Sequence, residues 1–337
     1  MNSPTRNGRT VIFGGGGFVG LNVAEALLAH GGAVELVDVK PPPKVALDSL
    51  SRLPGTLRSS EGDVRDPERL AALLSEDVDS VVFGAAITAG ADRDAREPER
   101  ILDVNLLGFV RVLRAARDQG IRRVINISSA AAYGDAAWRA TDPLDEEISP
   151  DPVGLYALTK FGTERVARRL SELWRLDVRS VRLSAVFGPW ERQTGDRDTP
   201  SALFQIMRAA CSGEPAILSR PGDRDWVFGT DVGAAIVALL DAEQPRYDLY
   251  NISPGEAFSA LAWGQSLAQH RPGFVCRLAE PGETATIDLF GGRDRVPLAI
   301  DRLVNDLGCQ PQFDLMRSVQ HYDAWVRGNA GYDPQAA

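Results

Sequence analysis

Short apolar runs alternate with amphipathic helical stretches along the first half of the chain. The runs typical of strands are TVIF (10–13), AVELVDV (33–39), DSVVFGAA (79–86) and RVINISS (123–129). Helical patterns cover 19–32, a stretch from about Pro67, 94–119 and 154–175. Near-continuous apolar strands that alternate with helices are typical of a parallel sheet covered on both faces. The pattern therefore predicts an α/β fold with a Rossmann-type, doubly wound parallel sheet.

The second half keeps part of this rhythm, with a strand at 178–184 and a helix at 230–241. Its loops are longer and richer in Gly, Pro and Arg, notably 188–200 and 219–229. We expect residues 1–180 to form the main domain. Residues 181–337 are expected to form mainly a smaller lobe, interleaved with the last strands of the main sheet.

The composition of the chain argues against several classes of partner and cellular location. The chain has 337 residues and a net charge of −9, so nucleic acid and anionic membranes are poor partners for it. It contains no apolar run of about 18 residues, and its first residues are polar, which predicts a cytoplasmic protein. The three cysteines are far apart, without disulfide or zinc spacing, so we expect reduced thiols and no metal site.

Glycines occupy the turn between the first strand and the first helix. The sequence GGGGFVG places Gly14, Gly17 and Gly20 three residues apart. A bare backbone there lets a dinucleotide pyrophosphate approach the helix N-terminus, where unpaired N–H groups favour negative charge. The alternative is a tight glycine turn without a ligand. The dinucleotide site is favoured by the order of the segments, in which a strand, the glycines, a helix and a second strand are followed by an acidic residue.

The acid is Asp38, which ends the second strand eighteen residues after Gly20. Its carboxylate can accept hydrogen bonds from an adenosine ribose and would repel a 2′-phosphate. Asp38 therefore favours NAD over NADP, although Lys40 would offset part of that repulsion. A surface position before a turn is the other interpretation of Asp38.

A second group of candidate catalytic residues lies in LYALTK (155–160), where Tyr156 and Lys160 share one helix face. An ammonium beside a phenol lowers the pKa of the phenol, so Tyr156 could act as a general acid or base. NISSAAAYG (126–134) places Ser128 and Ser129 at the carboxyl end of a parallel strand, where α/β sheets bind ligands. A serine hydroxyl there could hydrogen-bond a carbonyl or alkoxide.

In this combination and order, the chain resembles the extended short-chain dehydrogenase/reductases, the NAD-dependent epimerase/dehydratase group. The similar segments span nearly the whole chain and include GGGGFVG, GDVRD (62–66), GAA (84–86), DVNLLG (103–108), NISSAAAYG, YALTK, RLSAVFGP (182–189), RDWVFGTDV (224–232) and YNISPGE (250–256). The resemblance implies a Rossmann-type domain that binds NAD, a smaller C-terminal substrate-binding lobe and a homodimer formed through the helices at 94–119 and 154–175.

The resemblance also implies a set of site residues. Those expected to hold the cofactor are Gly14, Gly17, Phe18, Val19, Gly20, Asp38, Asp63, Val64, Ala85, Ala86, Asn105, Tyr156 and Lys160. Those expected at the reacting carbon are Ser129, Tyr156 as acid/base and Lys160, which also tunes Tyr156. Arg224 matches an arginine that contacts diphosphate in nucleotide-sugar members. The other interpretation of Arg224 is a surface ion pair with Asp223 or Asp225.

Departures from the family pattern limit the choice of substrate. Ala130 and Ala131 replace the Asp-Glu pair of the dehydratases, which makes sugar dehydration a poor fit. Ala185 replaces an asparagine that is usual in nucleotide-sugar epimerases, and 291–301 lacks their Arg-x-Gly-Asp although it holds arginines. The loop at 188–201 is the expected specificity element. Its members Trp190, Arg192 and Arg197 either face the substrate or are solvated.

These features predict an NAD-dependent oxidoreductase or epimerase that transfers hydride at a secondary alcohol carbon of a sugar-like substrate. A nucleotide-sugar epimerase or reductase is the first hypothesis. An NAD-dependent dehydrogenase of a free sugar acid or other small hydroxy compound is the second, and a non-catalytic NAD(P)-sensing protein is the third.

Overall fold

A seven-stranded parallel sheet forms the centre of the computed structural model, which describes residues 8–75, 77–193, 195, 197–289 and 294–329. The sheet order is β11-β6-β5-β4-β1-β2-β3. The strands are β1 (Arg9–Phe13), β2 (Ala33–Asp38), β3 (Thr56–Glu61), β4 (Val78–Phe83), β5 (Arg123–Ser129), β6 (Asp177–Leu183) and β11 (Leu249–Ile252). The chain winds outwards from β1 in both directions, so the predicted doubly wound α/β fold is confirmed.

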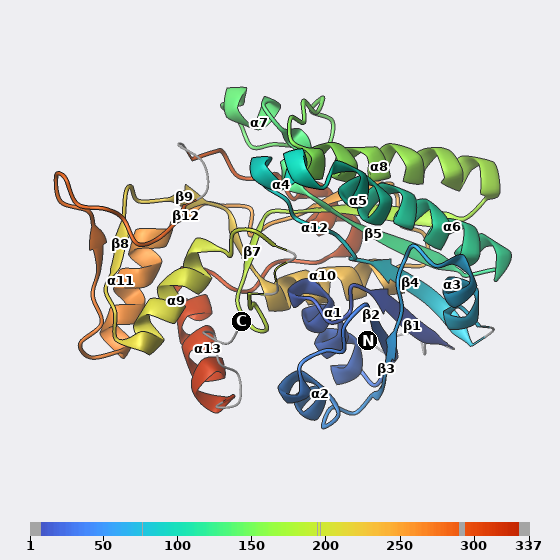
Figure 1. Cartoon of the computed structure of the whole chain (residues 1–337), viewed down its shortest axis with the longest axis horizontal. Helices are drawn as coiled ribbons and strands as arrows, with labels where there is room; N and C mark the ends of the chain where they lie inside the picture. Colours follow the sequence, from blue (N-terminus) through green and yellow to red (C-terminus); the bar gives the residue numbers. More distant parts are fainter. Residues whose placement is uncertain (1–7, 76, 194, 196, 290–293, 330–337) are drawn as a thin grey trace.

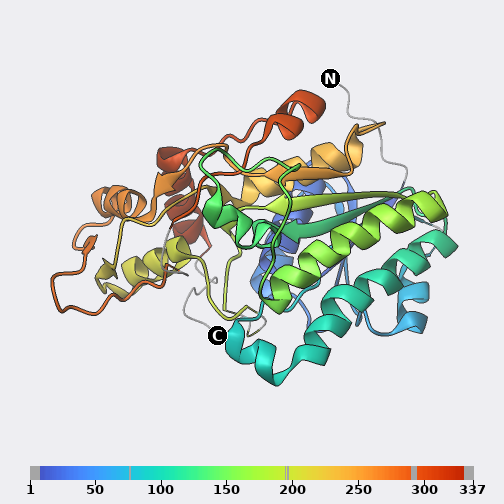
Figure 2. The same ribbon diagram turned by 90° about the horizontal axis from the view of Figure 1, so that it is seen from above.

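Helices cover both faces of this sheet, as Figures 1 and 2 show. One layer contains α1 (Phe18–Ala29), α2 (Lys44–Leu50), α10 (Gly229–Asp241) and α12 (Asp301–Leu307). The other contains α3 (Pro67–Leu73), α5 (Pro98–Leu102), α6 (Gly108–Asp118) and α8 (Leu155–Trp174). Successive strand residues point to opposite faces, so Val11 packs towards the second layer and Ile12 towards the first.

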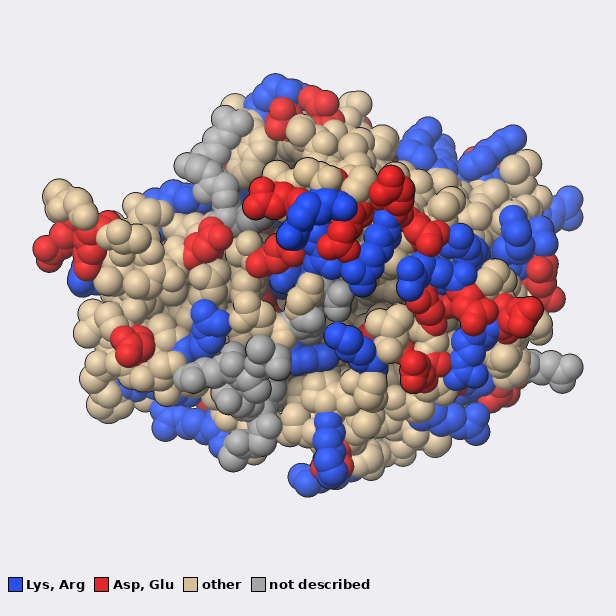
Figure 3. All heavy atoms as spheres, in the orientation of Figure 1, with Lys and Arg blue, Asp and Glu red and all other residues tan. Residues whose placement is uncertain are grey.

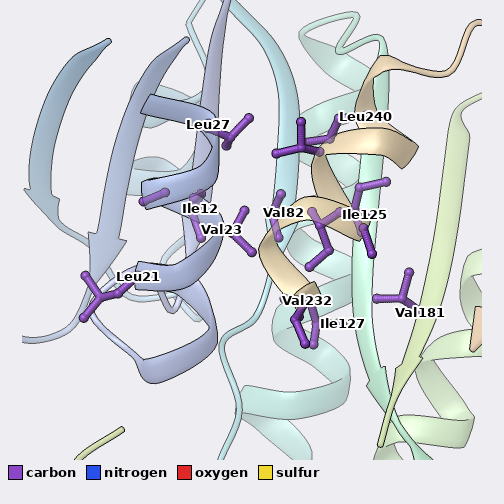
Figure 4. Close-up of a cluster of buried hydrophobic side chains, with 14 of the residues drawn as sticks. Ile12, Leu21, Val23, Leu27, Val82, Ile125, Ile127, Val181, Val232 and Leu240 are labelled. Carbon is purple, nitrogen blue, oxygen red and sulfur yellow. The ribbon is translucent and has the colours of Figure 1, made fainter. Parts of the chain in front are cut away.

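Helices α1 and α10 lie side by side on the sheet and close the first core (Figure 4). Their approach is close because α10 carries glycines at the contact. A Cβ atom on Gly233 would lie 2.6 Å from the carbonyl oxygen of Asn22. A helix from the second half of the chain therefore covers the first half of the sheet. The division at residue 180 stays a prediction.

The remaining strands form three small two-stranded sheets in a second lobe, drawn on the left of Figure 1. They pair β7 (Ala185–Phe187) with β10 (Trp226–Phe228), β8 (Ala216–Leu218) with β13 (Cys276–Leu278) and β9 (Asp223–Arg224) with β12 (Phe258–Ser259). Helices α9 (Ala202–Ser212), α11 (Ala260–His270) and α13 (Leu315–Gly328) accompany them. This lobe has its own core, built on Phe187, Trp263 and Tyr322.

Two expectations about local structure were wrong. The single helix expected at 94–119 is divided into α4 (Ala91–Arg96), α5, a π-helical turn η1 (Asp103–Leu107) and α6. Pro98 restricts the residue before it, so the chain leaves the helix at Glu97. The sequence pattern predicted no strand between residues 39 and 79, but this stretch contains β3, whose sequence TLRSSE is polar because it is an edge strand with little burial. A 3-10 turn η2 (Ala130–Tyr133) and a short α7 (Ala136–Arg139) follow β5.

Acidic and basic side chains lie interspersed on the face drawn in Figure 3. Within the described ranges, none of the helices is both long enough and apolar enough to cross a bilayer.

Candidate cofactor and active site

The glycine loop connects β1 to α1 at the carboxyl edge of the sheet. Gly14 has a φ of +74°, and a Cβ atom there would lie 2.7 Å from the backbone nitrogen of Ala85. A Cβ on Gly20 would lie 2.5 Å from the Gly14 carbonyl oxygen. Side chains at these positions would fill the space before α1, which begins at Phe18 and Val19. The bare cradle and the helix N-terminus therefore fit a dinucleotide pyrophosphate.

Asp38 lies beside this loop at the end of β2. Its Oδ2 accepts a hydrogen bond from the Gly16 nitrogen at 3.0 Å, and its Oδ1 accepts one from the Val39 nitrogen at 2.8 Å. The carboxylate is thus fixed at the edge of the loop, where the predicted adenosine ribose would reach it. Lys40 is exposed two residues further on.

The other residues expected along the cofactor follow β3 and β4. Asp63 forms an ion pair with Arg65 at 2.6 Å, and hydrogen bonding from that guanidinium holds the pKa of Asp63 below its usual range. Val64 is buried against Gly108. Ala85 and Ala86 follow β4, half-buried. All of these residues share the sheet edge with the glycine loop, and their roles toward the cofactor stay predictions.

Asn105 lies in the π-helical turn and is buried. Its Oδ1 accepts a hydrogen bond from the Ile87 nitrogen at 2.8 Å, while its Nδ2 donates to the Ile87 oxygen at 3.0 Å. A further bond runs from Nδ2 to Thr159 Oγ1 at 3.1 Å. Asn105 thus links the segment after β4 to α8, which carries Tyr156.

Ser129, Tyr156 and Lys160 are brought together at the ends of β5 and the start of α8. Ser129 and Thr88 lie beside the Tyr156 phenol, where their side chains lower its pKa against the effect of burial. The Nζ of Lys160 lies 5.7 Å from the centroid of the Tyr156 ring and donates to the Ile127 carbonyl oxygen at 2.6 Å. Thr88 was missed in the sequence. Its position just after Ala85 and Ala86, at the carboxyl end of β4, is the signal that points to it.

The electrostatics correct one expectation. Burial raises the pKa of Tyr156, and hydrogen bonds from Ser129 and Thr88 together with the charge of Arg197 only oppose that rise. Burial also lowers the pKa of Lys160 to about 8, against the attraction of Glu164. The expected lowering of the phenol pKa by Lys160 is therefore absent here, because the ammonium is turned to a backbone carbonyl and burial dominates.

Ser128 has a different role from Ser129. Its Oγ donates to Glu164 Oε1 at 2.5 Å, and Arg182 binds both oxygens of the same carboxylate, at 2.9 and 2.7 Å. The Arg182 guanidinium also lies 4.3 Å above the ring of Tyr133. These groups form a buried ion pair beneath the active site. The sequence placed Glu164 one helical turn after Lys160, which was the signal that could have revealed it.

The loop at 188–201 contains three more residues for which the sequence left two interpretations. Trp190 neither faces a substrate nor is solvated: it is buried, donates to Glu25 at 2.7 Å and packs edge-on against Trp325. Arg192 donates to the carbonyl oxygen of Gly16 at 2.6 Å, so it contacts the glycine loop. Arg197 forms an ion pair with Glu191 at 3.1 Å.

Arg224 lies in the short strand β9, with its guanidinium 5.7 Å from the centroid of the Trp226 ring. The proposed partner Asp225 is used elsewhere, since it pairs with Arg295 at 2.8 Å and accepts from Ser253 and Leu298. No carboxylate of the described part of the chain forms an ion pair with Arg224, so the ion-pair alternative is wrong. Burial and the nearby Arg295 lower the pKa of Arg224 to about 10. Arg293 lies outside the described residues.

The fold and this site are matched by a known family. The chain belongs to the NAD-dependent epimerase/dehydratase family, whose sequence model matches residues 10–253. It is therefore an NAD-dependent enzyme rather than a sensing protein, and NAD is its cofactor.

Its relatives include a dTDP-L-rhamnose 4-epimerase from Burkholderia thailandensis, 25% identical over 97% of this chain and 97% of the relative. A UDP-glucose 4-epimerase from Mycolicibacterium smegmatis is 30% identical over 68% of this chain and 72% of the relative. Among solved structures, UDP-glucose-4-epimerase from Stenotrophomonas maltophila, with bound NAD and formylated UDP-arabinopyranose, superposes with a TM-score of 0.81. That structure is 23% identical and covers 96% of this chain and 99% of its own.

Proposed function

We propose that the chain is a nucleotide-sugar epimerase or reductase, acting at a secondary alcohol carbon of the sugar. The observation that carries this proposal is the guanidinium of Arg224, half-buried without a carboxylate partner among the described residues. A planar, charged donor in that state suits a diphosphate. The relatives named as epimerases of dTDP- and UDP-sugars support the same substrate class.

The sheet topology supports placing Arg224 near the reacting carbon. Ser129 pairs with Leu183 across β5 and β6, and the next residue, Ser184, donates to the Asp225 carbonyl oxygen at 2.7 Å. Arg224 therefore adjoins the same carboxyl edge of the sheet that presents Ser129. A sugar at Ser129 and a diphosphate at Arg224 fit one substrate.

Bound NAD supplies the hydride acceptor at this edge. Tyr156, as the phenolate, takes the proton of the reacting hydroxyl, and Ser129 hydrogen-bonds the oxygen that remains. Lys160 stands one helical turn after Tyr156, with its Nζ 5.7 Å from the centroid of the phenol ring, and we expect it to hold the nicotinamide ribose. Ala130 and Ala131 lack the acid and base needed to eliminate water, so these residues support redox chemistry without dehydration.

The second candidate is an NAD-dependent dehydrogenase of a free sugar acid. It is favoured by Ala185, which stands at the start of β7 where the nucleotide-sugar epimerases have an asparagine. The two candidates differ in what becomes of the reduced cofactor. Retained NADH in the purified protein, seen by mass spectrometry and absorbance, supports an epimerase, whereas freely exchanging cofactor supports a dehydrogenase.

A thermal-shift panel with UDP, dTDP, GDP and CDP tests the substrate class. We expect one of them to stabilise the wild-type protein, and Arg224→Gln to weaken its binding about 10–100-fold by removing a charged donor. Arg246→Gln is the control, since Arg246 stacks on Tyr247 before β11, at the other edge of the sheet. If no nucleoside diphosphate stabilises the wild-type protein, the free sugar acid becomes the better hypothesis.

We also propose a homodimer formed through η1 and α8. Leu107 and Leu158 are 48% and 43% exposed, and both belong to the adjoining helical layer visible in Figure 2. We expect the double variant Leu107→Asp/Leu158→Asp to be monomeric in light scattering, because paired burial would place carboxylates in an apolar contact. Val275→Asp, which changes an exposed apolar residue of the second lobe, should leave the dimer intact. A wild-type protein that is monomeric at micromolar concentration would refute the proposal.

A further inference from the structure

The helix that carries Tyr156 begins without a cap of its own. Helix α8 starts at Leu155 after Gly154, which has no side chain to accept a hydrogen bond, and its first turn contains no acidic residue. The first N–H groups of a helix have no partner within the helix, and they favour negative charge. Tyr156 is the second residue of α8, so its position depends on how this first turn is held.

A carboxylate from another helix caps this turn. The Oδ2 of Asp94, in α4, accepts a hydrogen bond from the Leu155 nitrogen at 2.9 Å. The Oδ1 of Asp94 is buried and has no hydrogen-bond partner among the described residues. Burial of a carboxylate oxygen without a partner is unfavourable. Asp94 thus holds the start of α8 although its own burial costs free energy, which is typical of residues kept for a function rather than for stability.

The segment after β4 holds Asp94 in place. The carbonyl oxygen of Gly90 accepts from the Asp94 nitrogen at 2.9 Å in the first turn of α4. The neighbouring Arg93 is buried and pairs with Asp198 at 3.2 Å. The carboxylate of Asp198 also accepts from the Gly90 nitrogen at 2.7 Å. The carboxylate of Asp94 is therefore presented to α8 from a turn that is itself tied to the rest of the fold.

A second contact joins the same segment to α8 one turn later. Asn105, which is bonded to Ile87, donates to Thr159 Oγ1 at 3.1 Å, and Thr159 in turn donates to the Tyr156 oxygen at 2.8 Å. Helix α8 is thus held at Leu155 and at Thr159, on either side of Tyr156. Thr159 lies inside the helix, where backbone hydrogen bonds hold it, whereas Leu155 lies at the end that frays. The contact with Asp94 is therefore the one on which the first turn depends.

We propose that Asp94 is a positioning residue of the reaction: as the cap of α8, it fixes the first turn so that the Tyr156 phenol stays beside Ser129. This rests on the proposed role of Tyr156 as the base. Asp94 acts through the backbone of α8 and takes no part in binding NAD or the sugar. Its loss should therefore slow the chemical step and leave both affinities almost unchanged.

The test compares Asp94→Ala, Asp94→Asn and wild type in steady-state kinetics and in NAD titration. In Asp94→Ala we expect kcat to fall about 10–100-fold, because a small displacement of the base is costly. KM and the Kd for NAD should stay within about twofold, since Arg224 and the glycine cradle are untouched. Asp94→Asn keeps an oxygen acceptor of the same size and should restore kcat to within about threefold. A role of the negative charge alone would not give this rescue.

Asp314→Ala is the matched control, because it removes a cap of the same kind from a helix without site residues. Asp314 accepts from the Arg317 nitrogen at 2.8 Å at the start of α13. This variant should leave kcat within about twofold of the wild-type value. If kcat in Asp94→Ala falls no further than in Asp314→Ala, the role of Asp94 is refuted and the proposed function stands.

Hydrogen exchange measures the cap without turnover. Amides of residues 155–160 should exchange about fivefold faster in Asp94→Ala than in wild type, as loss of a cap predicts. Unchanged exchange in this segment would refute the inference whatever the kinetics show. If exchange rises but the wild-type enzyme turns over a free sugar acid instead of a nucleotide sugar, the proposed function fails, and the same comparison of kcat on that substrate decides the role of Asp94.

Discussion

Replacing Tyr156 by Phe is expected to lower kcat by about 10²–10⁴-fold, because it removes the group that takes the hydroxyl proton. Affinity for NAD should persist, since Gly14, Gly20 and Asp38 shape the glycine cradle independently of the phenol. Steady-state turnover on the nucleotide sugar, together with a fluorescence titration with NAD, measures the two effects separately.

Tyr247→Phe is the matched control for this variant. The Tyr247 ring packs against Tyr250 ahead of β11, so it lies at the edge of the sheet opposite the carboxyl ends. Its loss of a hydroxyl should leave kcat within about twofold, as for surface changes away from a site. Near-normal turnover by the Tyr156→Phe enzyme would show that another group is the base.

Glu164→Ala should cost about 3–5 kcal/mol of unfolding free energy, the largest effect on stability that we expect. The change leaves the guanidinium of Arg182 charged and 2% exposed, without its carboxylate partner. It also removes the acceptor of the Ser128 hydroxyl. Urea unfolding followed by tryptophan fluorescence would measure the loss.

The double variant Glu164→Met/Arg182→Met separates an unpaired charge from lost packing. It removes both charges, so it should be clearly more stable than Glu164→Ala. Glu172→Gln, which affects an exposed ion pair with Arg169 on the same helix, should cost less than about 1 kcal/mol. A Glu164→Ala protein as stable as the Glu172→Gln protein would contradict the importance of the buried pair.

The architecture could be predicted from the sequence where local patterns and tertiary burial agree. Strands β1, β4 and β5 are buried on both faces, so their apolar runs identified them directly. Strand β3 was missed because it is an edge strand, and its polar residues carry no burial signal. The sequence pattern predicted one helix at 94–119 even though this segment contains Pro98. The amphipathic pattern continues across Pro98, so the division of the helix was missed.

In the candidate site, too, the sequence revealed local patterns but not the contacts between distant segments. Glycine spacing and the Tyr156–Lys160 pair are local patterns, so the sequence could reveal them. The direction in which Lys160 points depends on the Ile127 carbonyl oxygen, which belongs to strand β5 and is distant in sequence from α8. The burial of Trp190 depends on Glu25 and Trp325, which are distant in sequence. Contacts of this kind are set by tertiary packing, which periodicity does not report.

The close packing of α10 on α1 bears on how substrate preference can be exchanged between relatives. A recombination point at residue 180 would separate Gly233 from the Asn22 carbonyl that it approaches and would expose the inner side of α1. A chimaera should therefore inherit α10, β11 and α12 from the parent that provides β1 to β6. Only the three small sheets and their helices would then be free to vary as a transferable module.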